Sequence, residues 1–130
     1  MADVLDIKQG TTRTVTVKGL RDADGNLLDP TGWDLHAVAR PGLWAAPVAV
    51  WRDNPGAGEM LAVVVDADPE LDPAVLPGEK WIDLQIDPAD SDPWTWGTAV
   101  LDVEITEPDT FRQEAFSTEL RLVPAVVRSA

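Results

Sequence analysis

Hydrophobic and polar residues alternate along most of this chain, in short runs that Asp, Gly and Pro residues separate. Residues 12–18 are the plainest example, since Val15 and Val17 alternate with Thr14 and Thr16. A period of two places successive side chains on opposite faces of a β-strand. The pattern therefore predicts strands that turn one face toward a core.

The same alternation recurs from one end of the chain to the other, and turn residues lie between the runs. Residues 22–26, Asp-Ala-Asp-Gly-Asn, predict a hairpin turn because Gly and Asn tolerate positive φ. Residues 60–65 are apolar on both faces, which predicts a strand buried on both sides. Seven or eight such strands predict an all-β fold, a two-sheet antiparallel sandwich that forms one domain, residues 1–130. The expected strands are residues 4–7, 12–18, 33–40, 60–65, 80–86, 98–106 and 113–123, with residues 43–51 as an edge strand at best.

Charge and composition exclude several classes of partner. The chain has 23 acidic and 10 basic residues and a net charge of −13, so it lacks the excess of Lys and Arg that favours binding to nucleic acid. An anionic membrane surface is excluded on the same ground. No cysteine is present, which rules out disulfides and thiolate metal sites. The acidic N-terminus does not resemble a signal peptide, and no apolar run approaches the roughly 20 residues of a membrane-spanning helix.

The residues that catalysis needs are nearly absent. His36 is the only histidine, and the alternation places it on the face of its strand opposite Leu35 and Ala37, as a surface or packed-edge side chain. No serine lies in a glycine-flanked elbow, and neither a phosphate-binding loop nor a zinc motif occurs. We therefore expect a protein that is not an enzyme and that has no cofactor.

Two acidic segments have the composition of calcium ligands. Residues 22–26 place carboxylates at alternate positions with a glycine, but the Glu that completes an EF-hand loop is missing and the flanking segments are strands. A plain hairpin turn is the favoured interpretation there. Residues 87–93 place three carboxylates in a tryptophan-bearing loop, where calcium binding and simple solvation stay open as alternatives.

The six tryptophans carry most of the functional interest, since tyrosine is absent. Trp33 and Trp81 stand at strand starts and are expected in the core. The other four lie in or near irregular segments, where exposed rings suit protein interfaces or stacking on sugars. These four candidate interface residues are Trp44, Trp51, Trp94 and Trp96.

Several segments together resemble a known group of proteins. They are residues 7–12 (IKQGTT), residues 18–33 (KGLRDADGNLLDPTGW), residues 100–108 and residues 122–128 (LVPAVVR). In these segments the chain resembles the immunoglobulin-like β-sandwich domains of tailed-bacteriophage structural proteins, of the type at the N-terminus of baseplate upper proteins. A QGDT start, a DADGNPLDLTG hairpin, a DLEITDPDG strand-turn and a VTR-like end recur in that group. This chain departs from the pattern at Thr11, at Pro30 and in the tryptophan-bearing loop of residues 87–97.

The resemblance implies a single immunoglobulin-like sandwich that acts by assembly and has no catalytic residue. The expected role is a structural protein of the virion, in the tail or baseplate first and as capsid decoration or neck second, made in the host cytoplasm. Its expected partners are other virion proteins in a symmetric assembly, further copies of the chain included. Residues 1–9 and 123–130 are expected to act as docking arms. The rival hypothesis is a carbohydrate-binding module, which predicts that Trp44, Trp51, Trp94 or Trp96 lie coplanar on one face.

Overall fold

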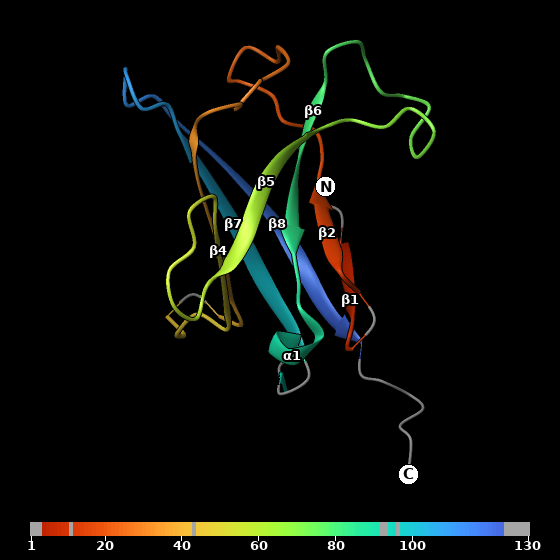
Figure 1. Cartoon of the computed structure of the whole chain (residues 1–130), viewed down its shortest axis with the longest axis vertical. Helices are drawn as coiled ribbons and strands as arrows, with labels where there is room; N and C mark the ends of the chain where they lie inside the picture. Colours follow the sequence, from red (N-terminus) through yellow and green to blue (C-terminus); the bar gives the residue numbers. More distant parts are fainter. Residues whose placement is uncertain (1–3, 11, 43, 92–93, 96, 124–130) are drawn as a thin grey trace.

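The structure is a computed structural model that describes residues 4–10, 12–42, 44–91, 94–95 and 97–123. It contains eight strands and one short helix, so the prediction of an all-β fold is confirmed (Figure 1). The elements in chain order are β1 (Val4–Lys8), β2 (Thr14–Val17), β3 (Asp34–Arg40), β4 (Ala49–Arg52), β5 (Met60–Asp66), β6 (Lys80–Gln85), α1 (Pro88–Ser91), β7 (Thr98–Thr106) and β8 (Gln113–Val123).

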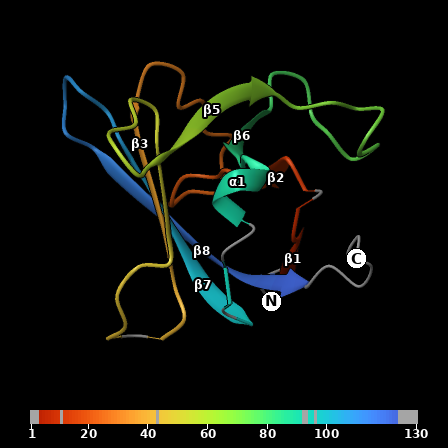
Figure 2. The same cartoon turned by 60° about the horizontal axis from the view of Figure 1, so that its bottom comes forward.

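The eight strands form one mixed sheet in the order β1-β8-β7-β3-β4-β5-β6-β2. Its two halves are joined by the short parallel pairing of β4 with β5, at Trp51–Met60 and Arg52–Leu61. The terminal strands of the order, β1 and β2, lie close to each other, so the sheet curls nearly into a barrel (Figures 1 and 2). The core therefore lies between the β2-β6-β5 side and the β4-β3-β7-β8 side.

The pairing differs in one respect from the expected antiparallel arrangement. Strands β1 and β8 run parallel, with Val4 opposite Glu119 and Lys8 opposite Val123, and the β4–β5 pair is also parallel. Alternation along the chain sets which face a strand buries, but it carries no information on the direction of its neighbour. The orders β2-β6-β5 and β4-β3-β7-β8 coincide with the B-E-D and C′-C-F-G strand orders of immunoglobulin domains.

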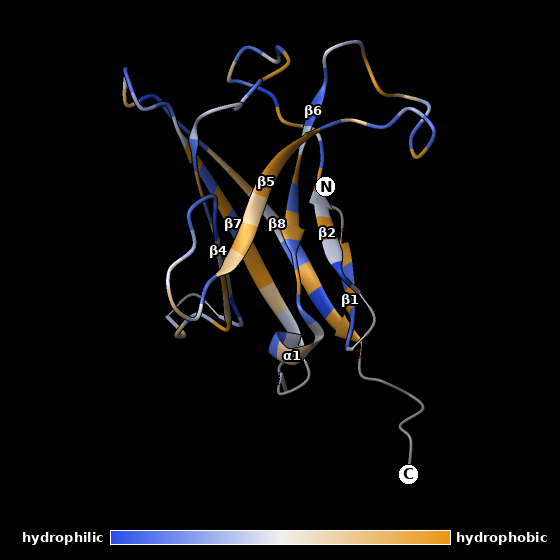
Figure 3. Ribbon diagram, in the orientation of Figure 1, coloured by the Kyte–Doolittle hydropathy of each residue, from blue (hydrophilic) through white to orange (hydrophobic). Residues whose placement is uncertain are grey.

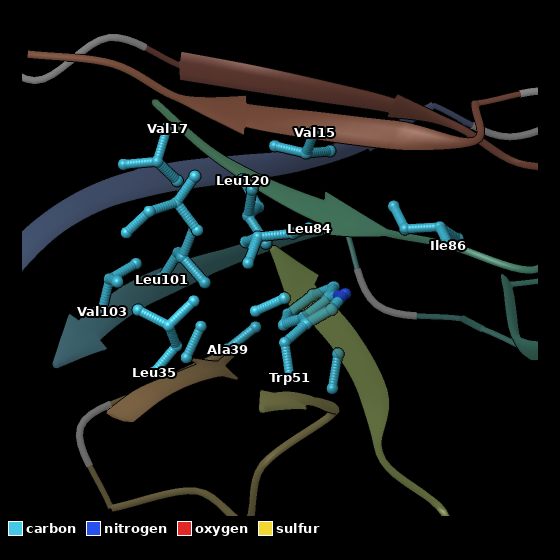
Figure 4. Close-up of a cluster of buried hydrophobic side chains, with 14 of the residues drawn as sticks. Val15, Val17, Leu35, Ala39, Trp51, Leu84, Ile86, Leu101, Val103 and Leu120 are labelled. Carbon is cyan, nitrogen blue, oxygen red and sulfur yellow. The ribbon is translucent and has the colours of Figure 1, made fainter. Parts of the chain in front are cut away.

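Apolar side chains from both sides meet in one core, and polar residues alternate with them along the outside (Figures 3 and 4). Trp81 is buried as expected, and Trp33 is half-buried against the core. Burial in β7 follows the predicted alternation closely, because its inward side chains are all at most 2% exposed. These inward residues are Ala99, Leu101, Val103 and Ile105.

Two expectations about the middle of the chain were wrong. Strand β4 lies between β3 and β5 and is not at an edge of the sheet, and it begins two residues after Pro47, so this proline does not interrupt its ladder. Strand β5 buries one face only: Ala62 is in the core, whereas Leu61, Val63 and Val65 on the other face stay partly exposed. The outer face of β5 thus remains apolar without being covered.

Candidate interaction surfaces

The first of the predicted interface tryptophans, Trp51, belongs to the core. It lies in β4 and is fully buried, and its Nε1 donates a hydrogen bond of 2.9 Å to the carbonyl oxygen of Gln85 (Figure 4). The sequence prediction for this residue was wrong because the strand that buries it is only four residues long and follows a proline.

Trp44 is the most exposed aromatic residue among those that the structure describes. Its side chain is 94% exposed, in the loop of residues 41–48 between β3 and β4. Trp94, by contrast, is half-buried and packs against the core, and Trp96 lies outside the described residues. Among the described tryptophans, Trp44 alone is a strongly exposed ring, so the described part of the chain holds no coplanar set of exposed tryptophan rings.

One buried side chain, that of Gln9 directly after β1, holds the segment that carries Trp94. The Gln9 amide Nε2 donates hydrogen bonds of 2.9 Å to the carbonyl oxygens of Ser91 and Trp94, and Gln9 is only 6% exposed. Asp87 begins α1 by accepting a hydrogen bond from the Ala89 amide. Residues 87–91 thus form a capped helical turn at the same end of the molecule as the loop with Trp44 (Figure 1).

The described residues of the expected docking arms are part of the sheet. Residues 4–8 form β1 along β8, Ile7 is fully buried, and Gln9 donates its backbone N–H to the Val123 carbonyl oxygen. Residues 4–9 are therefore held along β8 within the chain itself. Residues 1–3 and 124–130 lie outside the described residues.

At the opposite end of the molecule, residues 22–26 form the predicted turn. The Asp22 carboxylate accepts hydrogen bonds from the backbone N–H groups of Asp24 and Asn26, at 2.9 and 3.0 Å, and Gly25 has a φ of 83°. The Asn26 bond, the Asp24 bond and the nearby Arg112 guanidinium together hold the pKa of the Asp22 carboxyl below its usual value. The carboxylate therefore holds the turn together, as the hairpin interpretation requires.

Arg112 connects this turn to the β7–β8 hairpin. Its guanidinium lies 3.7 Å from Asp22, 3.1 Å from Glu114 and over the ring of Trp33, whose centroid is 5.8 Å away. Arg112 thereby fixes loops that are far apart in sequence next to each other.

Phe111, at the tip of the β7–β8 hairpin, was not identified from the sequence. It is 79% exposed and has a φ of 56°, which makes it the one non-glycine residue with positive φ in the described part of the chain. An L-residue in this region loses about 1–2 kcal/mol, so glycine is the usual occupant. The only signal in the sequence is the turn Pro108-Asp109-Thr110, because the residue that follows it is not the glycine that such a turn usually has.

The carboxylates near His36 accept hydrogen bonds that hold neighbouring segments together. Glu59 accepts hydrogen bonds from the Gly56 N–H and from Arg52, at 2.7 and 2.8 Å, and these bonds lower the pKa of the Glu59 carboxyl. The Asp53 carboxylate accepts a bond from the Leu35 N–H. A general acid needs a raised carboxyl pKa, which is the opposite of the shift at Glu59. The described residues contain no group of three or more His, Asp or Glu side chains placed to hold a metal ion, and Asp92 of the second calcium candidate lies outside them.

A hollow of about 530 Å³ lies between β2 and β8, where the sheet does not close. Val17, Val103 and Phe116 line it together with hydroxyl side chains, and Lys18 is the one charged residue among its described lining. A catalytic site needs several converging polar or titratable groups, so this lining does not form one.

No family model, no curated protein and no solved structure matches this chain. In the part of the chain that the structure describes, no helix is long and apolar enough to cross a membrane.

Proposed function

We propose that the chain is a structural, non-enzymatic protein of a tailed-phage virion, in the tail or baseplate first and as capsid decoration or neck second. It acts by docking onto neighbouring proteins in a symmetric assembly. The proposal starts from the resemblance of residues 7–12, 18–33 and 100–108 to immunoglobulin-like phage domains. The strand order, which coincides with that of immunoglobulin domains, supports the same proposal.

The residues that carry the resemblance have structural tasks at the two ends of the fold. Gln9 joins β1 to the segment after α1, and Asp22 forms the turn that Arg112 ties to the β7–β8 hairpin. Fold and function are separate questions, and these residues support the fold part of the proposal. The assembly part needs a surface that is built for contact.

Trp44 is the observation that carries the assembly part. Tryptophan is enriched among the residues that dominate binding at protein interfaces, because its large ring is buried when the partner docks. A ring that is 94% exposed leaves most of its apolar area in water until a neighbour covers it. We therefore place Trp44 at a contact with another virion protein.

Hydroxyl-radical footprinting of the purified chain and of intact phage particles, read by peptide mass spectrometry, tests this placement. We expect the Trp44 ring to be oxidised rapidly in the free chain and to be protected in the particle. Trp51 is the internal control, because it is buried in the chain itself and is expected to be protected in both samples. Equal oxidation of Trp44 in both samples would overturn the placement.

The carbohydrate-binding alternative rests on the same ring, because a flat exposed indole stacks on sugars. It predicts quenching of tryptophan fluorescence by a host-surface polysaccharide, and loss of that quenching in Trp44→Phe. The assembly proposal predicts no quenching in either protein. Quenching that disappears with Trp44 would favour the alternative.

A further inference from the structure

The connection between β5 and β6 is a long loop, residues 67–79, that contains neither a helix nor a strand. The Ala67 N–H donates a hydrogen bond of 3.0 Å to the Glu79 carbonyl oxygen, so the two ends of the loop are held together. The loop stands away from the sheet in both views (green, Figures 1 and 2). Loops of this length inside a compact domain are uncommon, and they are usually either functional or disordered.

Hydrogen bonds within the loop hold it in one shape. The Asp68 carboxylate accepts a hydrogen bond from the Glu70 N–H at 2.9 Å, and the Asp68 carbonyl oxygen accepts from the N–H groups of Leu71 and Asp72. The Asp72 carboxylate accepts from the Ala74 N–H at 3.0 Å. The backbone is restricted further by three prolines, Pro69, Pro73 and Pro77. A loop that is ordered in this way loses little conformational entropy when it binds a partner.

Two leucines project from this ordered loop into solvent. The Leu71 side chain is 73% exposed and the Leu76 side chain is 47% exposed. Each leaves much of its apolar area in water, and burial of that area against another protein would be favourable. A protein interface has an apolar centre surrounded by a polar rim. The two leucines are suited to form such a centre.

The charges of the loop determine which partner suits it. Asp68, Glu70 and Asp72 flank Leu71, and residues 67–79 contain no Lys or Arg. None of these three carboxylates has an ion-pair partner among the described residues. A second copy of the chain, with its net charge of −13, would bring like charge to the loop, whereas a basic protein surface would attract it.

We propose that the loop of residues 67–79 docks onto another virion protein, at an apolar depression that Lys and Arg side chains surround. The two leucines enter the depression, and the three carboxylates face its basic rim. The bonds inside the loop use only Oδ1 of Asp68 and of Asp72, which leaves Oδ2 of each for the partner. This inference rests on the proposed function and adds the chemistry of one partner to it.

Competition for incorporation into particles tests the two leucines. A phage from which the gene for this chain is deleted infects cells that express the wild-type chain and one variant in equal amounts. Peptide mass spectrometry of the purified particles then gives the ratio in which the two are incorporated. We expect L71S/L76S to be incorporated about tenfold less than the wild type. The matched control is V4S/V100S, at two residues that are each 48% exposed outside the loop, and its ratio should stay near one.

The same competition tests the charge of the loop. Glu70 suits this test because its carboxylate accepts no hydrogen bond from the described residues and lies next to Leu71. Glu70→Lys should be incorporated about two- to fivefold less than the wild type, which corresponds to the loss of one surface ion pair. Glu119→Lys, at an exposed position of β8, makes the same charge change and should compete equally with the wild type. Thermal unfolding of each purified variant confirms that it folds, because substitutions at exposed positions change the Tm little.

The outcomes separate the loop from the proposed function. Equal incorporation of L71S/L76S and the wild type would overturn the docking of the loop and leave the virion role intact, as would equal losses in L71S/L76S and its control. Absence of the wild-type chain itself from the particles would contradict the proposed function. Analytical ultracentrifugation of the purified chain examines the other occupant: a dimer that L71S/L76S abolishes would overturn the inference, because a second copy would then cover the leucines.

Discussion

Phe111 combines a backbone conformation that favours glycine with an aromatic side chain that stays in solvent. Its φ is 56° and its side chain is 79% exposed, so the fold gains little from the ring. We expect Phe111→Gly to stabilise the chain by about 1 kcal/mol and to raise its Tm by about 4 °C in calorimetry. The adjacent Thr110→Gly is the control, and it should lower the Tm because it adds unfolded-state freedom and removes the hydroxyl that accepts a hydrogen bond from the Arg112 N–H. A lower Tm for Phe111→Gly would contradict the conformational argument.

Asp22 makes the free energy of unfolding depend on pH in the acid range. Its hydrogen bonds from Asn26 and Asp24 hold the pKa of the folded state below the ordinary value of 3.8, so the folded protein favours the ionised carboxylate. This contribution is present above the unfolded-state pKa and is lost as the pH falls through the lower folded-state pKa. Chemical denaturation between pH 6 and pH 2, a range of about two units either side of a carboxyl pKa, measures this loss. The free energy of unfolding should fall less over this range in Asp22→Asn than in the wild type.

The control for that measurement is Asp24→Asn. It removes a carboxylate from the same turn, but it keeps the Asp24 backbone N–H that donates to Asp22. The acid dependence of Asp24→Asn should stay close to that of the wild type. If both variants lose the same fraction of the pH dependence, general charge repulsion and not the Asp22 bonds would be the cause.

Sequence reasoning succeeded for residues whose surroundings are local and failed for those whose surroundings are not. The turn at Asp22 and Gly25 was predictable because its hydrogen bonds span four residues. Trp51 was misplaced because its burial depends on Gln85 and on strands distant in sequence. Phe111 was missed because the left-handed conformation of its backbone is imposed by the hairpin and not by the residue itself.

At the scale of elements, the chain depends on a few side chains that join one segment to another. Gln9 is the strongest case, since its buried amide donates to two carbonyl oxygens of the segment after α1. Gln9→Ala should lower the free energy of unfolding by about 2 kcal/mol, because it leaves buried carbonyls without their donor. Gln113→Ala, at an exposed position of β8, is the control and should change it by less than about 0.5 kcal/mol. Urea denaturation measures both, and equal effects would show that the Gln9 bonds contribute little.

The ends of a strand were predictable from the sequence where apolar and polar residues alternate strictly. The neighbouring strands with which it pairs were not. Residues 98–106 were expected as a strand and coincide with β7. The parallel direction of β1 along β8 and the short pairing of β4 with β5 depend on which segments meet in space, which a local pattern of apolar residues does not encode. The apolar run of β5 was identified correctly, but a single chain leaves its second face uncovered.

At the scale of the whole molecule, an acidic fold with two differently built ends suits a component of an ordered assembly. One end carries Trp44, and the other carries Phe111 beside the Asp22–Arg112 contact. The net charge of −13 opposes non-specific association between unassembled copies. The central claim is that these surfaces are used inside a virion.

Quantitative peptide mass spectrometry of purified phage particles, from the genome that encodes this chain, tests that claim most directly. We predict that its peptides are present at a fixed copy number relative to the major capsid protein. Roughly three to a few tens of copies correspond to a baseplate or neck, and hundreds correspond to a tail tube or to capsid decoration. Absence of the chain from the particles would contradict the account.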